Sequence, residues 1–323
     1  MTEDIPLQAL AAYALQNPQA ALIRHNENMT YRVTDGERAY VLRIHRPVAG
    51  FSLGLFDTVD RTACIQSELE WIAALQQGAD LHMQTPVRGA NGAFVQMLAD
   101  GTPVSLLEWV DGQTADKVEL TPDLLQAIGA MAAKMHSYAE TQAQSGVRYN
   151  RLAYDQSILP DVAERIRAAH ELGVVPFGHR QTLLSALDAM QERFAALDAR
   201  QTTILTHADL SLSNMVVSAA GDVTPIDFGL SGYSHYQMDI GGLFSHIQKA
   251  EDRQMLLRGY ESAHGFACDM RSVEPYFALQ VLLFIATQYE RAVEWEWFSD
   301  ALVRWCGDIF TPLADGKPFL LLS

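Results

Sequence analysis

The hydrophobic pattern of this chain changes once, near residue 110, and that change constrains its fold more than any other feature. Before it, apolar and polar residues alternate in short runs, as in strands that are buried on one face. These runs predict strands over 29–33, 40–44, 93–98 and 103–109. One run between them, residues 58–77, has the spacing of a helix and is followed by Gly78. The first part of the chain is therefore predicted to be a sheet with a helix packed on it.

After a break at residues 110–112, the spacing of apolar residues is mostly helical. Helices are predicted over 122–139, 155–172, 179–198, 239–265 and 273–313. A β-rich interruption, residues 203–226, lies between the third and the fourth of them. We expect a fold of the α+β class with two lobes, a small β-rich lobe over residues 1–108 and a larger, mainly helical lobe over 109–323.

Composition narrows the classes of function. Lysine and arginine total 23 against 39 aspartate and glutamate, and the net charge of −16 repels a phosphate backbone, so no nucleic-acid partner is expected. The 3 cysteines lack the spacing of zinc sites or disulfide frameworks. No apolar run is long enough to span a bilayer, and the amino terminus lacks the basic segment of a secretory signal. We expect a cytoplasmic protein with no membrane partner, and the pattern does not indicate an oligomeric state.

The most informative stretch, residues 206–229, lies around the β-rich interruption. It contains His207, Asp209 and Asn214, followed by a strand, a turn and a strand that lead to Asp227. Phosphoryl transfer uses one carboxylate to orient the attacking hydroxyl and accept its proton. It uses a second carboxylate and an amide oxygen to hold Mg²⁺. Asp209 suits the first task, and Asn214 and Asp227 suit the second.

The spacing of these residues has a physical basis. A β-hairpin between Asn214 and Asp227 folds the chain back, so that the two residues meet at one end of the hairpin. An oxygen-only pair suits Mg²⁺ rather than zinc or copper. Each residue taken alone is better explained as a loop cap or a turn former. Their combination in a strand–turn–strand context indicates a phosphotransfer site.

These motifs resemble those of the aminoglycoside phosphotransferase and choline kinase family, small-molecule kinases with a bilobal protein-kinase-like fold. The resemblance covers nearly the whole chain, and the start of the chain looks like the homoserine-kinase-like branch. It implies ATP and Mg²⁺ as cofactors and a small molecule with a hydroxyl group as the acceptor. Ala208 departs from the family's His-Gly-Asp pattern. Asp239 matches the acidic residue that steadies the family's catalytic loop, and it could also be a helix N-cap.

The same resemblance indicates nucleotide-binding residues. In kinases a cation on the third strand grips the α- and β-phosphates and is held by a glutamate of the following helix. No lysine precedes Lys117, and alternation places Arg43 on the same strand face as Val41. Arginine can bind phosphate bidentately, so we predict this role for Arg43, with a solvated strand arginine as the alternative. The family's helix pattern favours Glu68 as its partner over Glu70.

Two further segments are expected to complete the nucleotide site. Residues 26–31 resemble the family's asparagine-rich nucleotide-covering loop, in which we expect Asn28 to bind nucleotide. Such a loop joins the first two strands or precedes them. The connector between the lobes, residues 108–112, is expected to read the adenine edge through backbone groups at Glu108 and Val110.

The acceptor is weakly encoded. Glu290 and Glu294 stand one turn apart in a predicted helix, beside Tyr289, Trp295 and Trp297. This combination could hold a cationic amine by charge and cation–π contact, and members of the resembled family bind amines in this region. The alternative is an ordinary helix with buried aromatic residues and solvated glutamates.

We therefore predict an ATP-dependent phosphotransferase acting on a hydroxyl of a small, amine-bearing molecule of the homoserine, choline or ethanolamine, or aminoglycoside type. The alternative from another class is a nucleotide-binding pseudokinase that binds a ligand or a partner without catalysis. A protein kinase is disfavoured, because the chain lacks a glycine-rich loop and an Ala-Pro-Glu-like segment after Asp227.

Overall fold

The computed structural model of the chain describes residues 5–48 and 60–320. Its largest sheet is antiparallel, with strands in the order β1–β2–β3–β6–β4 and with β5 also paired to β6. The strands are β1 (Gln19–His25), β2 (Met29–Asp35), β3 (Arg38–Ile44), β4 (Pro86–Val87), β5 (Gln96–Met97) and β6 (Pro103–Glu108). The hairpin predicted over 29–33 and 40–44 is confirmed as β2 and β3.

One face of this sheet carries its own hydrophobic cluster. Alternate residues of a strand point to the same face, and Tyr31, Val33 and Leu42 are buried there. Helix α1 (Ile5–Leu10) contributes Leu10 to the cluster. The residues between them, among them Arg43, point to the opposite face, where the candidate site lies.

Helix α2 (Arg61–Gly78) connects this sheet to the rest of the molecule. Asp60 caps its first turn by accepting a hydrogen bond from the amide of Ala63 at 3.0 Å. Trp71 and Leu75 are fully buried and belong to the larger hydrophobic cluster, which also contains the later helices. The predicted helix 58–77 is confirmed from residue 61 onward, and its first residues up to 59 lie outside the described residues.

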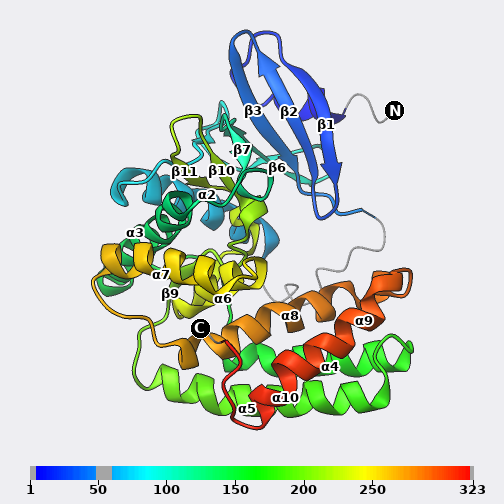
Figure 1. Ribbon diagram of the computed structural model, residues 1–323. Helices are drawn as coiled ribbons and strands as arrows, with labels where there is room; N and C mark the ends of the chain where they lie inside the picture. The colour runs from blue at the N-terminus through cyan, green and yellow to red at the C-terminus, as the bar shows by residue number, and fades with distance from the viewer. Residues whose placement is uncertain (1–4, 49–59, 321–323) are drawn as a thin grey trace.

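Helices dominate the described chain after residue 121. They are α3 (Pro122–Ser145), α4 (Leu159–Glu171), α5 (Phe177–Asp198), α6 (Gln237–His246), α7 (Ala250–His264), α8 (Met270–Ala292), α9 (Glu296–Trp305) and α10 (Thr311–Ala314). Helices α4, α5 and α8 contact one another, and Figure 1 shows them at the end of the molecule opposite the largest sheet. Within the described residues, no helix combines the length and the apolar character needed to cross a membrane.

Two small sheets interrupt this helical part. One has the order β11–β10–β7 and the other β8–β12–β9. Their strands are β7 (Gln113–Thr114), β8 (Leu152–Ala153), β9 (Ile204–Thr206), β10 (Met215–Val217), β11 (Val223–Pro225) and β12 (Gly232–Ser234). The β-rich interruption predicted over 203–226 is thus confirmed, and β12 extends it.

The predicted helix 239–265 is wrong in extent, because residues 247–249 separate α6 from α7. Arg253 of α7 donates to the backbone carbonyls of Phe244 and Ile247. It thereby satisfies the carbonyl of Ile247, just past the end of α6, and adds a donor to the carbonyl of Phe244, which also accepts from the amide of Ile247 at 3.3 Å. A side chain from the next helix sets this stop, and no glycine or proline marks it in the sequence.

The predicted helix 273–313 is also interrupted, by residues 293–295 between α8 and α9. Trp295 turns back onto Phe284 of α8, with their ring centroids 5.9 Å apart. Burying these rings against each other favours the reversal of the chain over a continuous helix.

Strand β1 is not predicted by the sequence, because it lies at the edge of its sheet with most of its side chains exposed. Leu22 and Ile23, which are adjacent, are 57% and 50% exposed. Because neither face of β1 is buried, its sequence need not alternate between apolar and polar residues. The predicted strand 93–98 is reduced to the two residues of β5.

Helices α3 and α7 cross at close range because of two glycines. A Cβ atom at Gly129 would lie 2.0 Å from the carbonyl oxygen of Leu256. A Cβ atom at Gly259 would lie 2.0 Å from the carbonyl oxygen of Gln126. Each glycine therefore faces the backbone of the other helix, and a larger residue would force the helices apart.

We expect Gly129→Ala to lower the free energy of unfolding by roughly 1–3 kcal/mol, because the added methyl group overpacks a backbone contact. Gly178→Ala is the matched control, since no atom lies within 4 Å of a Cβ at that position of α5. Urea unfolding of both variants measures the difference. Equal stability of the two variants would contradict the close crossing.

Candidate active site

The β-rich interruption brings the three predicted catalytic residues together. The amide of Ile226 donates to the carbonyl oxygen of Asn214 at 2.9 Å, so the hairpin of β10 and β11 returns the chain to this point and Asp227 follows. Nδ2 of Asn214 donates to the Asp209 carboxylate and to its carbonyl oxygen, at 2.9 Å each. Asp209, Asn214 and Asp227 therefore occupy one small region, as their spacing predicts.

A buried carboxylate holds the loop that carries Asp209. Asp239 of α6 is fully buried and accepts hydrogen bonds from the amides of His207 (2.9 Å) and Ala208 (2.7 Å). Nε2 of His136, on α3, donates to the same carboxylate at 2.9 Å. Burial would raise the pKa of Asp239, but the bond and charge of His136 together with the amide bond hold it below its usual value. The charged carboxylate thus fixes the loop backbone from two helices.

Of the two residues before Asp209, Ala208 has a strained backbone and His207 supports the loop through a hydrogen bond. Ala208 has a φ of 64°, in the left-handed region that favours glycine, which gives a physical reason for the glycine of the resembled family. Nε2 of His207 lies 2.9 Å from the carbonyl oxygen of Ile226, and burial lowers the pKa of His207. A neutral imidazole that donates through Nε2 supports the loop and needs no part in proton transfer.

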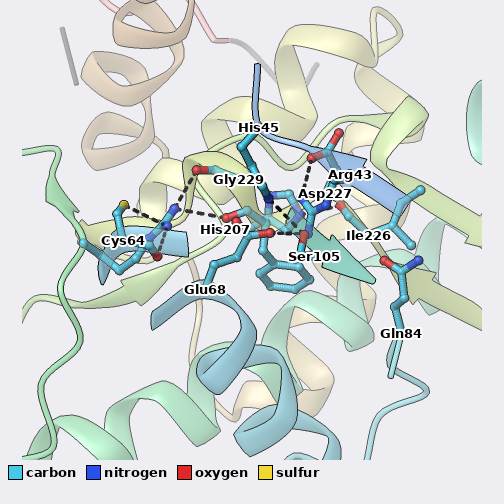
Figure 2. A network of polar contacts seen from close by, with 12 residues as sticks. Arg43, His45, Cys64, Glu68, Gln84, Ser105, His207, Ile226, Asp227 and Gly229 are labelled. Carbon is cyan, nitrogen blue, oxygen red and sulfur yellow. Dashed lines mark hydrogen bonds and ion pairs between the residues drawn. The ribbon is translucent and has the colours of Figure 1, made fainter. Parts of the chain in front are cut away.

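Arg43 and Glu68 form a buried ion pair, and their side chains point toward one another and toward Asp227 in Figure 2. Arg43 donates to Glu68 at 2.6 Å, and the two side chains are 7% and 2% exposed. Its other terminal nitrogen lies 3.6 Å from Asp227. Burial lowers the pKa of Arg43, but Glu68 and Asp227 more than offset this effect, so its pKa is raised. A solvated strand arginine is therefore the wrong alternative, and Glu70 is exposed.

Burial and neighbouring charges shift the pKa values of the carboxylates in this region in opposite directions. Asp227 has Arg43 near Oδ1 and Arg24 on Oδ2 at 2.5 Å. Burial raises the pKa of Asp227, but the two arginines lower it below its usual value. Burial, followed by the charge of Asp227, raises the pKa of Asp209 to about 7 and that of Glu27 to about 7. A carboxylate with a pKa near neutrality is suited to accept a proton from a hydroxyl.

The other predicted nucleotide residues lie at the expected places in the chain. The turn between β1 and β2 contains Asn28, whose carbonyl oxygen accepts from the amide of Asn26 at 3.2 Å. Residues 26–28 of the predicted covering loop therefore join the first two strands, whereas residues 29–31 lie in β2. Glu108 ends β6, and its carbonyl oxygen accepts from Nε2 of Gln84 at 3.0 Å. Val110 follows and is half-buried. No contact here bears on a nucleotide, so roles for Asn28, Glu108 and Val110 stay predictions.

Sequence reasoning missed Arg24 and Arg151. Arg151 is buried and donates to four backbone carbonyls at 2.6–3.1 Å, those of Cys64, Phe228, Gly229 and Ser231. Figure 2 shows Cys64 and Gly229 on one side of the polar network. Arg151 thus ties the first turn of α2 to the segment that follows Asp227. The sequence around Arg151 has no periodicity that would indicate this role. For Arg24, the only indication in the sequence is its position next to the predicted covering loop.

The expected amine site is not formed as predicted. Helix α8 ends at Ala292, so Glu290 and Glu294 do not share a helix, and both are exposed. Trp295 and Trp297 stack on each other, with ring centroids 5.4 Å apart. The argument from helical spacing is therefore wrong, because the chain turns between the two glutamates.

The oxygen atoms around Asn214 suit a magnesium ion. Asn214 uses Nδ2 as a donor, which leaves Oδ1 as an acceptor, and Asp227 offers a carboxylate nearby. Mg²⁺ is usually bound by one or two side-chain oxygens together with phosphate oxygens and water. Among residues 5–48 and 60–320 no group of three or more His, Cys, Asp or Glu could hold a metal by itself. Asn214 and Asp227 therefore fit an ion that arrives with phosphates.

Comparison with known proteins points to one family. The model of the phosphotransferase enzyme family, APH, matches residues 20–276. A protein of Deinococcus radiodurans, described only as uncharacterized, is 26% identical over 297 residues, covering 87% of this chain and 80% of that protein.

Solved structures of small-molecule kinases have a similar fold. A microcompartment-associated aminopropanol kinase is similar with a TM-score of 0.74 and 25% identity, over 99% of each chain. An amicoumacin kinase in complex with AMP-PNP, Ca²⁺ and Ami is similar with a TM-score of 0.72 and 19% identity, over 98% of this chain and 93% of that one. The predicted bilobal, protein-kinase-like α+β fold is confirmed, whereas the boundary between residues 108 and 109 stays a prediction.

We expect Asp239→Ala to lower the free energy of unfolding by roughly 2–6 kcal/mol, because two buried amides each lose their acceptor at a cost of about 1–3 kcal/mol. Asp188→Ala, at an exposed position of α5, is the control and should change it by less than about 0.5 kcal/mol. Urea unfolding compares the two. A loss for Asp239→Ala no larger than that of the control would show that this carboxylate does not hold the loop.

Proposed function

The chain belongs to the phosphotransferase enzyme family, and on this premise we propose that it moves the γ-phosphate of ATP to a hydroxyl of a small amine-bearing molecule. Transfer of a phosphoryl group to an alcohol of a small molecule is the activity of the class. The observation that carries the ATP-dependent mechanism is the convergence of Asp209, Asn214 and Asp227 beside the buried pair of Arg43 and Glu68.

Each residue has a distinct task in the proposed mechanism. Asp209 accepts a hydrogen bond from the acceptor hydroxyl, orients it and takes its proton, while Asn214 holds the Asp209 carboxylate in place. Asn214 and Asp227 would also bind Mg²⁺, which when bound neutralises charge on the phosphates. Arg43, fixed by Glu68, binds phosphate oxygens with a guanidinium that stays charged.

The acceptor class rests on the most informative of the structural similarities. One similar solved structure is named an aminopropanol kinase, and it covers 99% of this chain at 25% identity. This supports a small amino alcohol as the acceptor, within the predicted group of homoserine, choline or ethanolamine, and aminoglycosides. The net charge of −16 also favours a cationic molecule over an anionic one at long range.

We expect Asp209→Asn to lower kcat by roughly 10²–10⁴, because the variant keeps the size of the side chain and loses the base. Its dissociation constant for the nucleotide should stay within about twofold of the wild type, since the base contacts the acceptor and not the nucleotide. Steady-state kinetics and calorimetry measure the two quantities. Asp222→Asn, in the exposed turn between β10 and β11, is the control. An unchanged kcat in Asp209→Asn would exclude the mechanism.

Asp227→Ala is expected to abolish the Mg²⁺-dependent part of nucleotide binding, because it removes the only carboxylate of the proposed oxygen pair. Calorimetric titrations of ADP with and without Mg²⁺ separate this part from the rest. Asp222→Ala serves as the control in the same hairpin. If Mg²⁺ enhances binding equally in Asp227→Ala and the wild type, the assignment of the metal is wrong.

Transfer of labelled phosphate from ATP to a panel of hydroxyl compounds tests the acceptor class. The panel contains 1-amino-2-propanol, ethanolamine, choline, homoserine, an aminoglycoside and, without an amine, glycerol. We expect transfer to an amine-bearing member and none to glycerol. Nucleotide binding without transfer to any member would favour the pseudokinase alternative, and transfer to glycerol alone would contradict the acceptor class.

A further inference from the structure

Strand β1 contains a bulge that shifts the pairing between β1 and β2 by one residue. Leu22 pairs with Tyr31, but the next pair is Arg24 with Thr30, because Ile23 is the extra residue. A bulge of this kind re-aims the side chains that follow it. In a regular ladder Ile23 would occupy the place of Arg24.

The bulge places Arg24 in the same row of the sheet as Arg43. Thr30 of β2 pairs with Arg24 of β1 on one side and with Arg43 of β3 on the other. The two arginines therefore flank Thr30 from the two strands that neighbour β2. Both guanidinium groups reach Asp227, Arg24 at 2.5 Å from Oδ2 and Arg43 at 3.6 Å from Oδ1. Arg24 is thereby aimed at the carboxylate assigned to the metal, from a strand that leads directly into the loop expected to cover the nucleotide.

We propose that Arg24 is a second phosphate-binding residue of the nucleotide site, which acts beside Arg43 on the phosphates that the metal brings to Asp227. This inference rests on the proposed function and adds a residue that no motif in the sequence indicates. A guanidinium forms two parallel bonds to a phosphate, so the group that Arg24 offers to Asp227 also fits a phosphate oxygen pair.

A purely structural role explains the contact poorly. The side chain of Arg24 is 48% exposed and that of Asp227 18%, so water reaches the pair from the side of Arg24. Screening by water lowers the contribution of such an ion pair to stability. Arg43, in contrast, is 7% exposed and already has a buried partner in Glu68. Arg24 can therefore exchange its partner at low cost, whereas Arg43 is held in place.

The balance of charge favours the same conclusion. The carboxylates of Glu27 and Asp227 interact electrostatically with both Arg24 and Arg43. Asp209 interacts with Arg24, and Glu68 with Arg43. A nucleoside triphosphate adds further negative charge. Arg24 pairs with Asp227, a carboxylate that it shares with Arg43, whereas Arg43 also has Glu68. Arg24 supplies positive charge on the side of the site that faces β1.

The test compares the binding of adenosine, AMP, ADP and a non-hydrolysable ATP analogue, each with Mg²⁺, to the wild type and to Arg24→Ala by calorimetry. We expect affinity for ADP and the triphosphate to fall by about 10- to 100-fold, the value of a charge-assisted hydrogen bond, and affinity for adenosine to change by less than about twofold. The affinity of Arg24→Lys for ADP and the triphosphate should lie between those of the wild type and of Arg24→Ala, because lysine keeps the charge and loses the forked geometry of the guanidinium. Arg38→Ala, an exposed arginine at the other end of the β2–β3 pair, is the matched control and should bind all four ligands normally.

The outcomes separate this inference from the proposed function. If the wild type binds none of the nucleotides, the proposed function fails and the inference fails with it. If the wild type binds and Arg24→Ala binds ADP and the triphosphate equally well, only the inference is overturned. An equal loss for adenosine and the triphosphate would also overturn it, since Arg24 would then shape the hairpin. Unfolding midpoints equal to that of the wild type confirm that the variants are folded.

Discussion

The buried ion pair of Arg43 and Glu68 is the contact on which the arrangement of the candidate site depends. Two charges withdrawn from water are tolerated only when each is well paired, and losing either partner leaves an uncompensated buried charge. The pair therefore fixes β3 against α2, and the approach of Arg43 to Asp227 extends the constraint to the loop after β11. Arg151 adds to this constraint, because it donates hydrogen bonds both to the first turn of α2 and to the carbonyls that follow Asp227.

A second fixed point lies behind the loop of Asp209. Asp239 and Asp209 belong to one small region, yet their surroundings shift their pKa values in opposite directions. Asp239 accepts bonds from two amides and His136, which stabilise its charged form although it is buried. Asp209 is desolvated and faces other carboxylates, so its pKa rises to about 7. One carboxylate thus holds the backbone as a permanent anion, and the other is able to exchange a proton.

The charge of the whole chain and the charge of the site act on different ligands. A net charge of −16 repels an anionic nucleotide at long range, so the phosphates must be attracted locally. Arg24 and Arg43, in one row of the largest sheet, provide cations where Asp227 lies. The negative charge of the rest of the chain would attract the cationic acceptor that we propose, although it repels the nucleotide.

The sequence by itself determined the division into a β-rich and a helical part, the hairpin of β2 and β3, and the meeting of Asn214 with Asp227. These features follow from periodicity and turns, which act over a few residues within one element. Alternation along β3 also predicted the face of Arg43, whereas the choice of Glu68 as its partner rested on the resemblance to the family's helix pattern. The tertiary structure decided the breaks at 247–249 and 293–295, which depend on Arg253 and on Trp295 packing against other elements. It alone placed Arg24 on Asp227, 203 positions away, because a bulge in an exposed edge strand and the packing of the sheet against the loop after β11 leave no periodic trace in the sequence.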